Sequence, residues 1–533
     1  MFDLIHVYRE RIFFITALLT AIFFPFSEAM VSVFSGALLL QAVVMRSWKH
    51  PDVRNRSILP LLSLVSVFMV YLLWMLACKD FDSGVYELKK VIFWLVIPLA
   101  FFISPRLTEK QSYIILLVFV IAVFVSSLIS TGKLLLFDFS EVFSNRKVSY
   151  ISHIRFSFQV ILAILVLGYF LADKPYNFQF HNYWIAFIIL IWLITFLIIA
   201  QSLLAIISFA ITIFLFLLFY MWHTPEGMKR YVIQTVLFLI FFIPFLYTSK
   251  VIYDYFNYEN VDPLSLEKYT ESGNLYFHDL NDLSRENGNL VFIYVSHDEL
   301  RREWDKRSNH GYDEQLNGFP LHITLFRYMT SLGLRKDSVG LSRLSDDDIR
   351  QVEKGLTNFK FKRRLLSLYP RIYETIWELD AYWRSGDPNN KSLAQRIEFL
   401  RASFLLVREK PLLGIGTGNA NLEYNRIYDL MLSKLDKDKR ATSHNQYVNY
   451  LVKFGFIGFV WIVFAVVLPL FWTHQKNNSL FLMFLLVILF ANFGDSNLET
   501  HMGLSFFTFF YSFFLWNSPD RLRNSLTALN IRR

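Results

Sequence analysis

The 533-residue sequence has one cysteine, Cys78, and few charged residues. A single cysteine cannot form an intrachain disulfide, and it excludes an iron–sulfur cluster and any zinc site built from cysteines. Charged residues make up 18% of the chain, whereas soluble proteins carry about 25%. Hydrophobic residues reach 54%, and 56 residues are phenylalanine, more than soluble cores need. The composition therefore indicates a polytopic membrane protein.

The apolar residues are gathered in runs long enough to cross a bilayer. A spanning helix needs about 20 mostly apolar residues, because its backbone groups must be satisfied within the segment. Arg9 and Arg11 precede the first run like the basic end of a signal peptide, but the many later runs favour an uncleaved helix. The predicted fold is an all-α polytopic membrane protein of about twelve helices. The runs lie near residues 12–26, 29–47, 58–78, 86–104, 112–131, 152–172, 183–201, 203–222, 230–248, 446–472, 479–493 and 502–516.

The basic residues of the short connecting segments predict the orientation. Segments on the side of the termini carry many more lysines and arginines than the opposite segments. On the opposite side the basic residues are Lys79, Lys89, Lys90, Lys133, Arg146 and Lys147. By the positive-inside rule, both termini are cytoplasmic. The net charge of +9 therefore serves topology, and without a zinc finger, RNA-binding motif or basic helix we expect no nucleic-acid partner.

The runs divide the chain into three parts. These are the first nine membrane helices (1–248), one large hydrophilic segment outside the membrane (249–443), and the last three helices with a cytoplasmic tail (444–533). Ser345 and the three aspartates after it predict a helix cap before 349–358, and 392–408 has apolar residues at helical spacing. The segment has no repeat, low-complexity tract or long linker, so we expect a compact, mainly helical subdomain.

A glycine-rich stretch follows a predicted helix that ends at Pro411. The stretch Pro411–Asn419 reads PLLGIGTGN, and the helix before it carries Arg396, Arg401 and Arg408. Glycines let backbone amides approach an anion, and arginine offers planar donors to phosphate oxygens. GxGxG also closes ordinary turns, and this reading is favoured. The stretch is neither a dinucleotide fingerprint nor a P-loop.

Two further motifs place ionisable side chains at the outer membrane face. Ser443–Tyr447 reads SHNQY and puts His444 where the hydrophilic segment enters the tenth run. A surface histidine is usually only solvated, but an imidazole here could exchange a proton near neutral pH. Ser152–Ser157 reads SHIRFS, and its Arg155 is either ion-paired or bound to an anionic headgroup.

Acidic and basic residues flank these motifs. Asp495 and Glu499 in the last outer loop either bind a sugar or are hydrated, and we favour hydration. Lys89 and Lys90 begin the fourth run, where they either attract a diphosphate or anchor the interface. Together the motifs bring cations and a histidine to one outer face, which suits a lipid-linked, phosphorylated substrate.

Residues Arg396–Gly458 resemble the O-antigen ligase and polymerase superfamily. The resemblance rests on an arginine, an amphipathic helix, PLLGIGTGN, then SHNQY and Phe454–Gly458 (FGFIG), in the family's order. Pro320–Asp337, Ser152–Ser157 and Glu499–Gly503 further resemble a Bacteroidetes-like branch of the ligases.

The resemblance implies a GT-C-like membrane glycosyltransferase without metal or cofactor. Its ligases move a glycan from undecaprenyl diphosphate to a sugar hydroxyl of lipid A–core, on the periplasmic face of the inner membrane. His444 matches the family's essential histidine, and Arg396 matches the arginine expected to bind the donor diphosphate. Inversion at the anomeric carbon would follow from attack opposite the leaving group.

The sequence departs from the family at one turn. Where the family commonly has Ser-Arg, residues 201–204 read QSLL, so we expect Arg155 to supply the missing cation, with Lys90 or Lys147. The predicted catalytic residues are His444, Arg396 and Arg155. The predicted diphosphate contacts are Arg155, Arg396, Lys90 and Arg401, and the weaker substrate contacts are Asn445, Asn419, Glu499 and Lys147.

Other functions stay open. A polymerase of the same superfamily would use a second lipid-linked repeat as acceptor, and a protein O-oligosaccharyltransferase would use a protein hydroxyl. A transporter or flippase would need ionisable residues near mid-bilayer, broken helices and inverted repeats. Polar residues concentrate at one face instead, so we favour the ligase.

Overall fold

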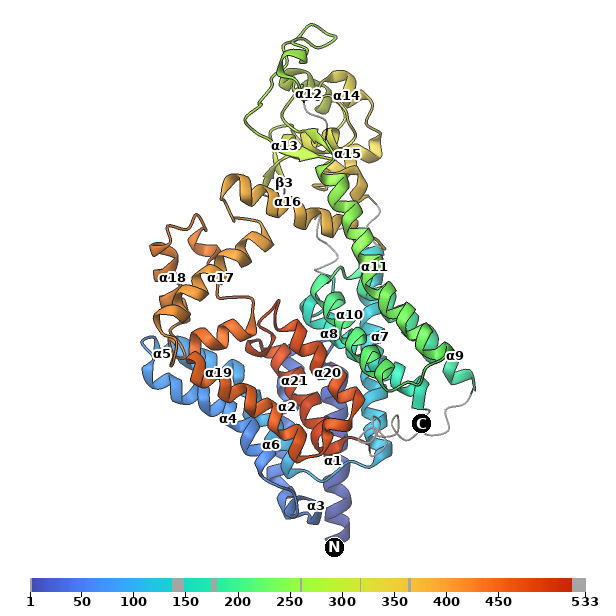
Figure 1. Cartoon of the computed structure of the whole chain (residues 1–533), viewed down its shortest axis with the longest axis vertical. Helices are drawn as coiled ribbons and strands as arrows, with labels where there is room; N and C mark the ends of the chain where they lie inside the picture. The colour runs from blue at the N-terminus through green and yellow to red at the C-terminus, as the bar shows by residue number, and fades with distance from the viewer. Residues whose placement is uncertain are drawn as a thin grey trace. The chain divides into compact units, whose positions relative to one another are not determined.

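The computed structural model describes residues 2–136, 148–173, 180–258, 261–316, 318–362 and 366–519. The chain forms two compact units, the first of residues 1–130, 149–237 and 387–533 and the second of 131–148 and 238–386. Helices dominate both units (Figure 1). The prediction of an all-α polytopic membrane protein is confirmed.

The first unit is a bundle of apolar helices. Two of its helices, α7 and α11, continue into residues of the second unit. The helices are α1 (Phe2–Phe23), α2 (Glu28–Val44), α3 (Pro51–Arg54), α4 (Leu59–Trp74), α5 (Phe81–Val91), α6 (Phe93–Ile103), α7 (Glu109–Leu136), α8 (His153–Asp173), α9 (Phe180–Ile199), α10 (Leu203–Trp222), α11 (Met228–Phe256), α17 (Ser392–Glu409), α18 (Ala420–Leu430), α19 (Gln446–Trp472), α20 (Ser479–Ala491) and α21 (His501–Asn517).

The predicted apolar runs fall on helices, although the run at 86–104 is divided between α5 and α6. Within the described part of the chain, six helices are long and apolar enough to cross a membrane. These are Leu59–Ala77, Glu109–Leu136, His153–Ala172, Leu203–Trp222, Met228–Phe256 and Gln446–Trp472. The shorter apolar helices are Glu28–Val44, Tyr183–Ile199 and Ser479–Ala491.

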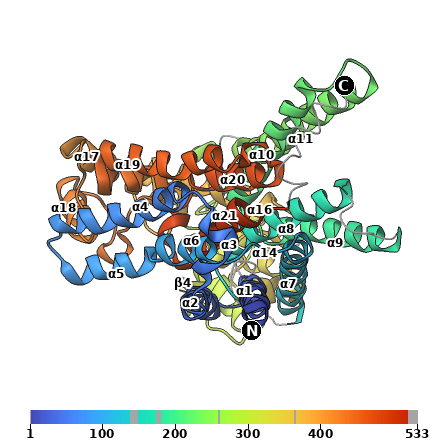
Figure 2. The same ribbon diagram turned by 90° about the horizontal axis from the view of Figure 1, so that it is seen from below.

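Helix α21 forms the centre of the first unit. Residues 502–517 are buried on all sides, as expected for a helix that is hydrophobic all round. Its aromatic rings pack edge to face with other helices, Phe510 against Phe119 at 4.7 Å and Phe509 against Phe24 at 5.3 Å. Helices α2, α6 and α20 contact α21, which Figure 2 shows in the middle of the bundle. Many of the phenylalanines therefore fill this core.

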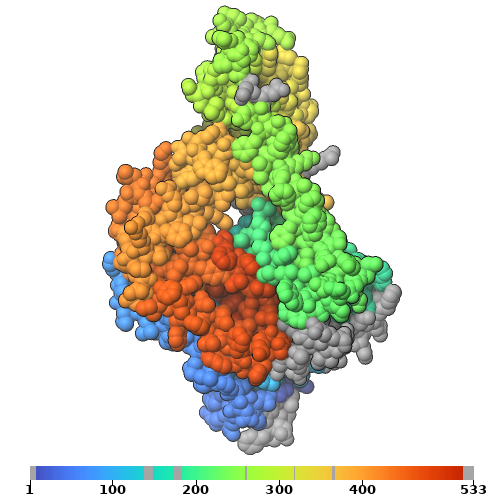
Figure 3. Space-filling view, viewed as in Figure 1, coloured from blue at the N-terminus to red at the C-terminus, as the bar shows by residue number. Residues whose placement is uncertain are grey.

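Helices α17 and α18 form a satellite core with the start of α19. Phe399 and Leu406 of α17 pack with Tyr428 of α18 and Val452 of α19, all of them buried. Figure 3 shows this C-terminal part of the first unit in orange and red on the face turned to the viewer. The packing fixes α17 relative to the start of α19.

The second unit is a small helical subdomain. Its helices are α12 (His297–Trp304), α13 (Leu321–Ser331), α14 (Ser338–Ser342), α15 (Asp346–Glu353) and α16 (Tyr369–Ser385). Two antiparallel ribbons join them, β1 (Arg285–Glu286) with β2 (Asn289–Leu290) and β3 (Gln315–Leu316) with β4 (Phe319–Pro320). The predicted cap is confirmed, since Ser345 and Asp348 form a capping box before α15.

Buried acids organise this unit. Glu286 accepts hydrogen bonds from Arg327 at 2.7 Å and Asn358 at 2.8 Å. Burial alone would raise the pKa of Glu299, but hydrogen bonds from Thr270 and its neighbours outweigh it and lower the pKa to about 2. Such fully paired groups stabilise a small core at neutral pH.

Candidate active site

One end of the first unit gathers ionisable side chains from helices far apart in sequence. At this end α4 and α20 terminate and α8, α19 and α21 begin. The loop Gly494–Glu499, which ends in the 3-10 turn η8 (Asn497–Glu499), lies at the centre of the group. The side chains around it are Arg155, Arg396, His444, Lys453, Asp495 and Glu499.

Hydrogen bonds hold the segment that carries His444 against this loop. The hydroxyl of Ser496 donates to the carbonyl of Ser443 at 2.9 Å, and the amide of Gln446 donates to the carbonyl of Asn492 at 2.9 Å. Both flanks of His444 are thus fixed before α19 begins.

His444 forms a pair with Asp495. Its Nδ1 lies 3.3 Å from Oδ1 of Asp495, whose side chain is 6% exposed, while the histidine side chain is 42% exposed. An ionised carboxylate only accepts hydrogen bonds, so Nδ1 is the donor and Nε2 of the neutral ring carries the lone pair. The imidazole can therefore accept a proton from a substrate hydroxyl.

Arg155 holds the other oxygen of the same carboxylate. Its Nη2 donates to Oδ2 of Asp495 at 3.3 Å, its Nε to Thr500 at 3.1 Å and its Nη1 to Ser152 at 2.9 Å. Three of the five guanidinium N–H groups are thereby engaged by the protein. Arg155 is oriented by Ser152 on its own motif and by Thr500 at the start of α21.

The charge of Asp495 is stabilised by these neighbours. Burial alone would raise its pKa, but the hydrogen bond with His444 and the charge of Arg155 lower it below the ordinary value. The amide of Ser496 adds a third donor at 2.9 Å. Asp495 is therefore a carboxylate at neutral pH and fixes the tautomer of His444.

Arg396 reaches the same loop from α17. Its Nη1 donates to the carbonyl of Gly494 at 3.0 Å, one residue before Asp495. The QSLL turn between α9 and α10 also lies here, because a Cβ on Gly494 would clash with the side chain of Leu204. The structure thus brings His444, Arg155 and Arg396 together, next to the turn that lacks the family's arginine.

Two other predicted diphosphate contacts have partners on their own helices. The ammonium of Lys90 lies 4.1 Å from the ring of Tyr86 on α5. Arg401 is bound to Glu398 at 2.7 Å with a 61% exposed side chain. It follows Arg396 by five residues, about 140° around the helix, so the two arginines point in different directions.

The predicted amide contacts have clear local roles. The side chain of Asn445 caps α19, accepting from the amides of Tyr447 and Val448 at 3.0 and 3.1 Å. Asn419 is buried, accepts from the amide of Lys79 at 2.7 Å and donates to Ala77 at 2.9 Å. Lys147 lies outside the described residues.

The glycine-rich stretch binds protein backbone. The amides of Ile415 and Gly416 donate to the carbonyls of Val452 and Lys453 at 2.8 and 2.9 Å. The amide of Thr417 donates to Trp74 at 3.3 Å. These amides are not available to an anion, in agreement with the favoured reading of the stretch as a turn.

Helix α19 is interrupted where the stretch meets it. Gly455 has φ 62° and ψ −169°, so the amides of Phe456 and Ile457 turn to the carbonyls of Pro411 and Leu412, at 2.8 and 3.2 Å. Backbone groups inside a membrane must find partners within the protein. The interruption frees amides and carbonyls of α19, and the turn satisfies both, because its carbonyls accept from the amides and its own amides donate to the carbonyls.

A buried ion cluster lies just before the interruption. Nζ of Lys453 is 3.0 Å from Glu87 and 2.9 Å from Glu499, and Glu499 also accepts from Tyr71 at 3.2 Å. Asn449 links the cluster to the loop, donating to Ser496 at 2.7 Å. The site and the cluster therefore form one hydrogen-bonded network.

The expectation that the two loop acids are hydrated was wrong. Asp495 is 4% exposed, and the side chain of Glu499 is 13% exposed. Each carboxylate has buried partners from other helices, which no local pattern shows. The sequence reasoning also missed Lys453 and Glu87, although a lysine inside the apolar stretch after SHNQY is a signal for a buried partner.

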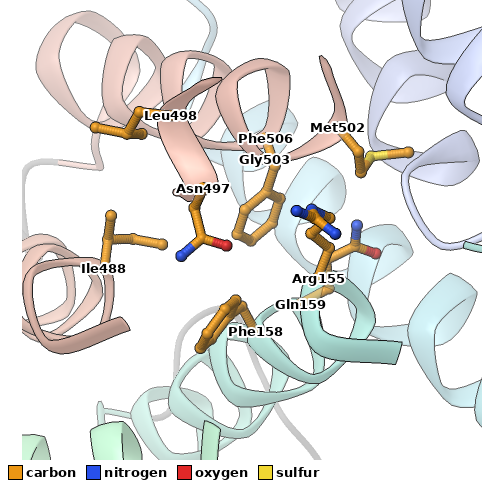
Figure 4. Close-up of a pocket in the computed structure, with 9 residues that line it drawn as sticks. All are labelled: Arg155, Phe158, Gln159, Ile488, Asn497, Leu498, Met502, Gly503 and Phe506. Carbon is orange, nitrogen blue, oxygen red and sulfur yellow. The ribbon is translucent and has the colours of Figure 1, made fainter. Parts of the chain in front are cut away.

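A small cavity lies beneath Arg155. It has a volume of about 10 Å³ and is lined by Arg155, Gln159, Asn497 and Met502 among others. Figure 4 shows Arg155 and Gln159 projecting from α8 toward Met502 and Gly503 of α21. The space suffices for about one water molecule. Throughout the described ranges, including this cavity, no group of three or more His, Cys, Asp or Glu is arranged to hold a metal ion.

These features define a polytopic membrane protein with an acid–histidine–arginine site at one end of its helices. Residues 358–463, which contain Arg396 and His444, match the family described as O-antigen ligase. The match confirms, for this part of the chain, the resemblance to the O-antigen ligase superfamily noted in the sequence. No curated protein matches the chain.

Proposed function

We propose that the protein is an O-antigen ligase that transfers a glycan from undecaprenyl diphosphate to a sugar hydroxyl of lipid A–core. The proposal places the protein in the bacterial inner membrane with both termini cytoplasmic, so that the site faces the periplasm. The observation that carries it is the convergence of His444, Asp495, Arg155 and Arg396 on one loop.

In this proposal His444 is the general base. The acceptor hydroxyl attacks the anomeric carbon, its proton passes to Nε2 of His444, and the bond from that carbon to the diphosphate oxygen breaks. Asp495 holds the imidazole through Nδ1 and stabilises the imidazolium that forms. Attack opposite the leaving group inverts the anomeric centre, and no metal or cofactor is required.

The arginines stabilise the departing undecaprenyl diphosphate. Negative charge grows on it as the bond breaks, so guanidinium groups bind the transition state more strongly than the ground state. Arg396 is the first contact, and Arg155 offers the N–H groups that Ser152, Thr500 and Asp495 leave. Lys90 and Arg401 are more distant contacts along the path of the donor.

The weaker candidates contribute to substrate binding indirectly. Asn445 and Asn419 position the ends of α19 and α18, and Glu499 anchors the loop through Lys453. Lys147 is an additional candidate for the donor side. We propose that 249–443 contributes to acceptor recognition.

A glycan polymerase and a protein O-oligosaccharyltransferase would use the same donor geometry. They differ in the acceptor, which the site residues do not identify. Transport has one feature in its favour, the interrupted helix with a buried lysine. Lys453 follows the start of α19 by seven residues, about 10 Å along the helix, so the feature lies near the site rather than at mid-bilayer.

Deletion of the gene separates these functions. Loss of a ligase leaves lipid A–core bare while long polymers accumulate on undecaprenyl diphosphate. Loss of a polymerase leaves core with at most one repeat, and loss of a protein glycosyltransferase leaves lipopolysaccharide unchanged. Loss of a flippase leaves lipid-linked glycan on the cytoplasmic side. Only the first result supports the ligase.

Complementation then tests the site residues. We expect His444→Ala and Arg396→Ala to abolish capping of lipid A–core, and Arg155→Ala to reduce it strongly. Arg408→Ala, on the same helix as Arg396, is the matched control and retains most activity because Arg408 is exposed and is not among the proposed donor contacts. Full rescue by His444→Ala, with normal protein levels, would overturn the assigned base, and wild-type capping by Arg155→Ala would overturn its role.

A further inference from the structure

A second polar cavity lies at the opposite end of the same helices. It has a volume of about 430 Å³, and its lining includes Arg56, Arg106, Trp472, His474 and Trp516. These residues come from the turn before α4, the segment after α6, and the ends of α19 and α21. None of them takes part in the site around His444.

The cavity and the site are separated by the length of a membrane helix. Helix α21 starts at His501, beside the site, and ends at Asn517, beside Trp516. Its 17 residues span about 25 Å, close to the thickness of the hydrocarbon layer of about 30 Å. The cavity therefore lies at the other membrane interface.

Arg56 enters the cavity with unused donors. Its Nη1 donates to the carbonyls of Phe101 and Phe102 at 3.0 and 2.7 Å, which anchors the side chain at the end of α6. Its Nε and Nη2 are buried and have no hydrogen-bond partner among the described residues. Leaving a buried charged donor unpaired is costly, so the geometry favours an added acceptor.

The local charge is positive. In the described part of the chain neither Arg56 nor Arg106 forms an ion pair. Burial, together with the charge of Arg106, lowers the pKa of Arg56 to about 10. Asp52 also lines the cavity and its charge opposes part of this lowering, but one carboxylate, 3.6 Å from His50, does not balance two arginines. An anion would relieve the repulsion between the two arginines.

The surroundings are apolar and aromatic. Trp472 is 40% exposed at the end of α19, and such tryptophans are typical of membrane interfaces. Further apolar side chains are exposed next to the lining residues, namely Ile58, Leu59 and Phe471. A ligand here can place a charged group between the arginines and acyl chains along the neighbouring helices.

We propose that this cavity binds the phosphate group of an anionic phospholipid, with Arg56 and Arg106 as its donors. A free phosphate ion would satisfy the same donors, but it would leave the exposed apolar rim without a partner. A zwitterionic lipid would bring its own cation toward two arginines. The anionic phospholipid satisfies both the charge and the apolar surroundings.

The test uses the full chain purified in detergent. Three additives are compared by the thermal unfolding midpoint as a function of concentration: phosphatidylglycerol, phosphatidylcholine with the same acyl chains, and inorganic phosphate. We expect saturable stabilisation by phosphatidylglycerol and much less by the other two. Arg56→Gln and Arg106→Gln should each weaken the response about tenfold or more, because a charge-assisted hydrogen bond is lost.

Arg54→Gln is the matched control, because Arg54 is an exposed arginine that does not line the cavity. Equal stabilisation by both lipids, or an equal loss in the Arg54 variant, would overturn the proposal. Stabilisation by inorganic phosphate alone, dependent on Arg56, would overturn the lipid as the source and identify a free anion. If Arg56→Gln does not fold, the exposed Arg106 provides the decisive variant.

Discussion

The interruption of α19 at Gly455 predicts a large effect for the smallest possible substitution. In Gly455→Ala, the new Cβ would clash with backbone atoms of Leu412 and Leu413. The backbone at φ 62°, ψ −169° is a glycine conformation that costs another residue about 1–3 kcal/mol. Relief of the clash would separate the turn from α19.

The hydrogen bonds at risk set the magnitude. The turn and α19 exchange four backbone hydrogen bonds, from Ile415, Gly416, Phe456 and Ile457. At about 0.5–1.5 kcal/mol each, their loss costs about 2–6 kcal/mol in addition to the strain. A destabilisation of this size is far above that of an ordinary surface change.

The assay is thermal unfolding in detergent, followed by lipopolysaccharide analysis of complemented cells. We expect the midpoint of Gly455→Ala to fall by several degrees and capping of lipid A–core to be lost. Gly36→Ala is the control, because that glycine lies in α2 with no atom near its Cβ position, and alanine favours a helix by about 1 kcal/mol. A midpoint and an activity of Gly455→Ala equal to those of the wild type would refute the structural role of the interruption.

Two further predictions concern the acids and the lysine at the site. Asp495→Asn should lower capping at least tenfold, because the amide cannot hold His444 and Arg155 together. The pKa of Asp495 is lowered in the folded protein, so the carboxylate stabilises the fold above the ordinary carboxyl pKa, and this contribution is lost on acidification. The unfolding midpoints of this variant and of the wild type should therefore differ less below pH 4 than at pH 7. Lys453→Met should lower the unfolding midpoint strongly, since two buried carboxylates lose their counter-ion. Glu87→Gln should lower it less, and equal shifts of the midpoint in the two variants would contradict the role assigned to Lys453.

Local patterns predicted most of the helices and several details of their ends. Hydropathy located the membrane helices, because the backbone in a membrane has few alternatives. The capping box at Ser345 and the end of α17 just before Pro411 follow from side chains close in sequence. The placement of Arg155 and His444 at one end of the bundle was also foreseen, because each lies at the same end of its span, whereas Arg396 joins them from α17 in the hydrophilic segment.

Features that depend on distant contacts were not predictable. Asp495 is buried only because Arg155 and His444 come from other parts of the chain. A glycine inside an apolar run is usually helical, so Gly455 gave no sign of an interruption without its partner turn. The division of the hydrophilic segment between the two units likewise depends on packing. Helices α17 and α18 belong to the first unit because they share a core with α19.

The exchange of backbone partners at Gly455 has a mechanical consequence. The turn after α17 is bonded to the first part of α19 through the amides of Ile415 and Gly416, and to the rest of that helix through those of Phe456 and Ile457. Backbone hydrogen bonds on both sides of the interruption, together with the shared core of α17 and α19, therefore hold the helices of Arg396 and His444 at a fixed separation. A displacement of either part of α19 is therefore passed to α17 through the turn, so the interruption does not act as a free hinge.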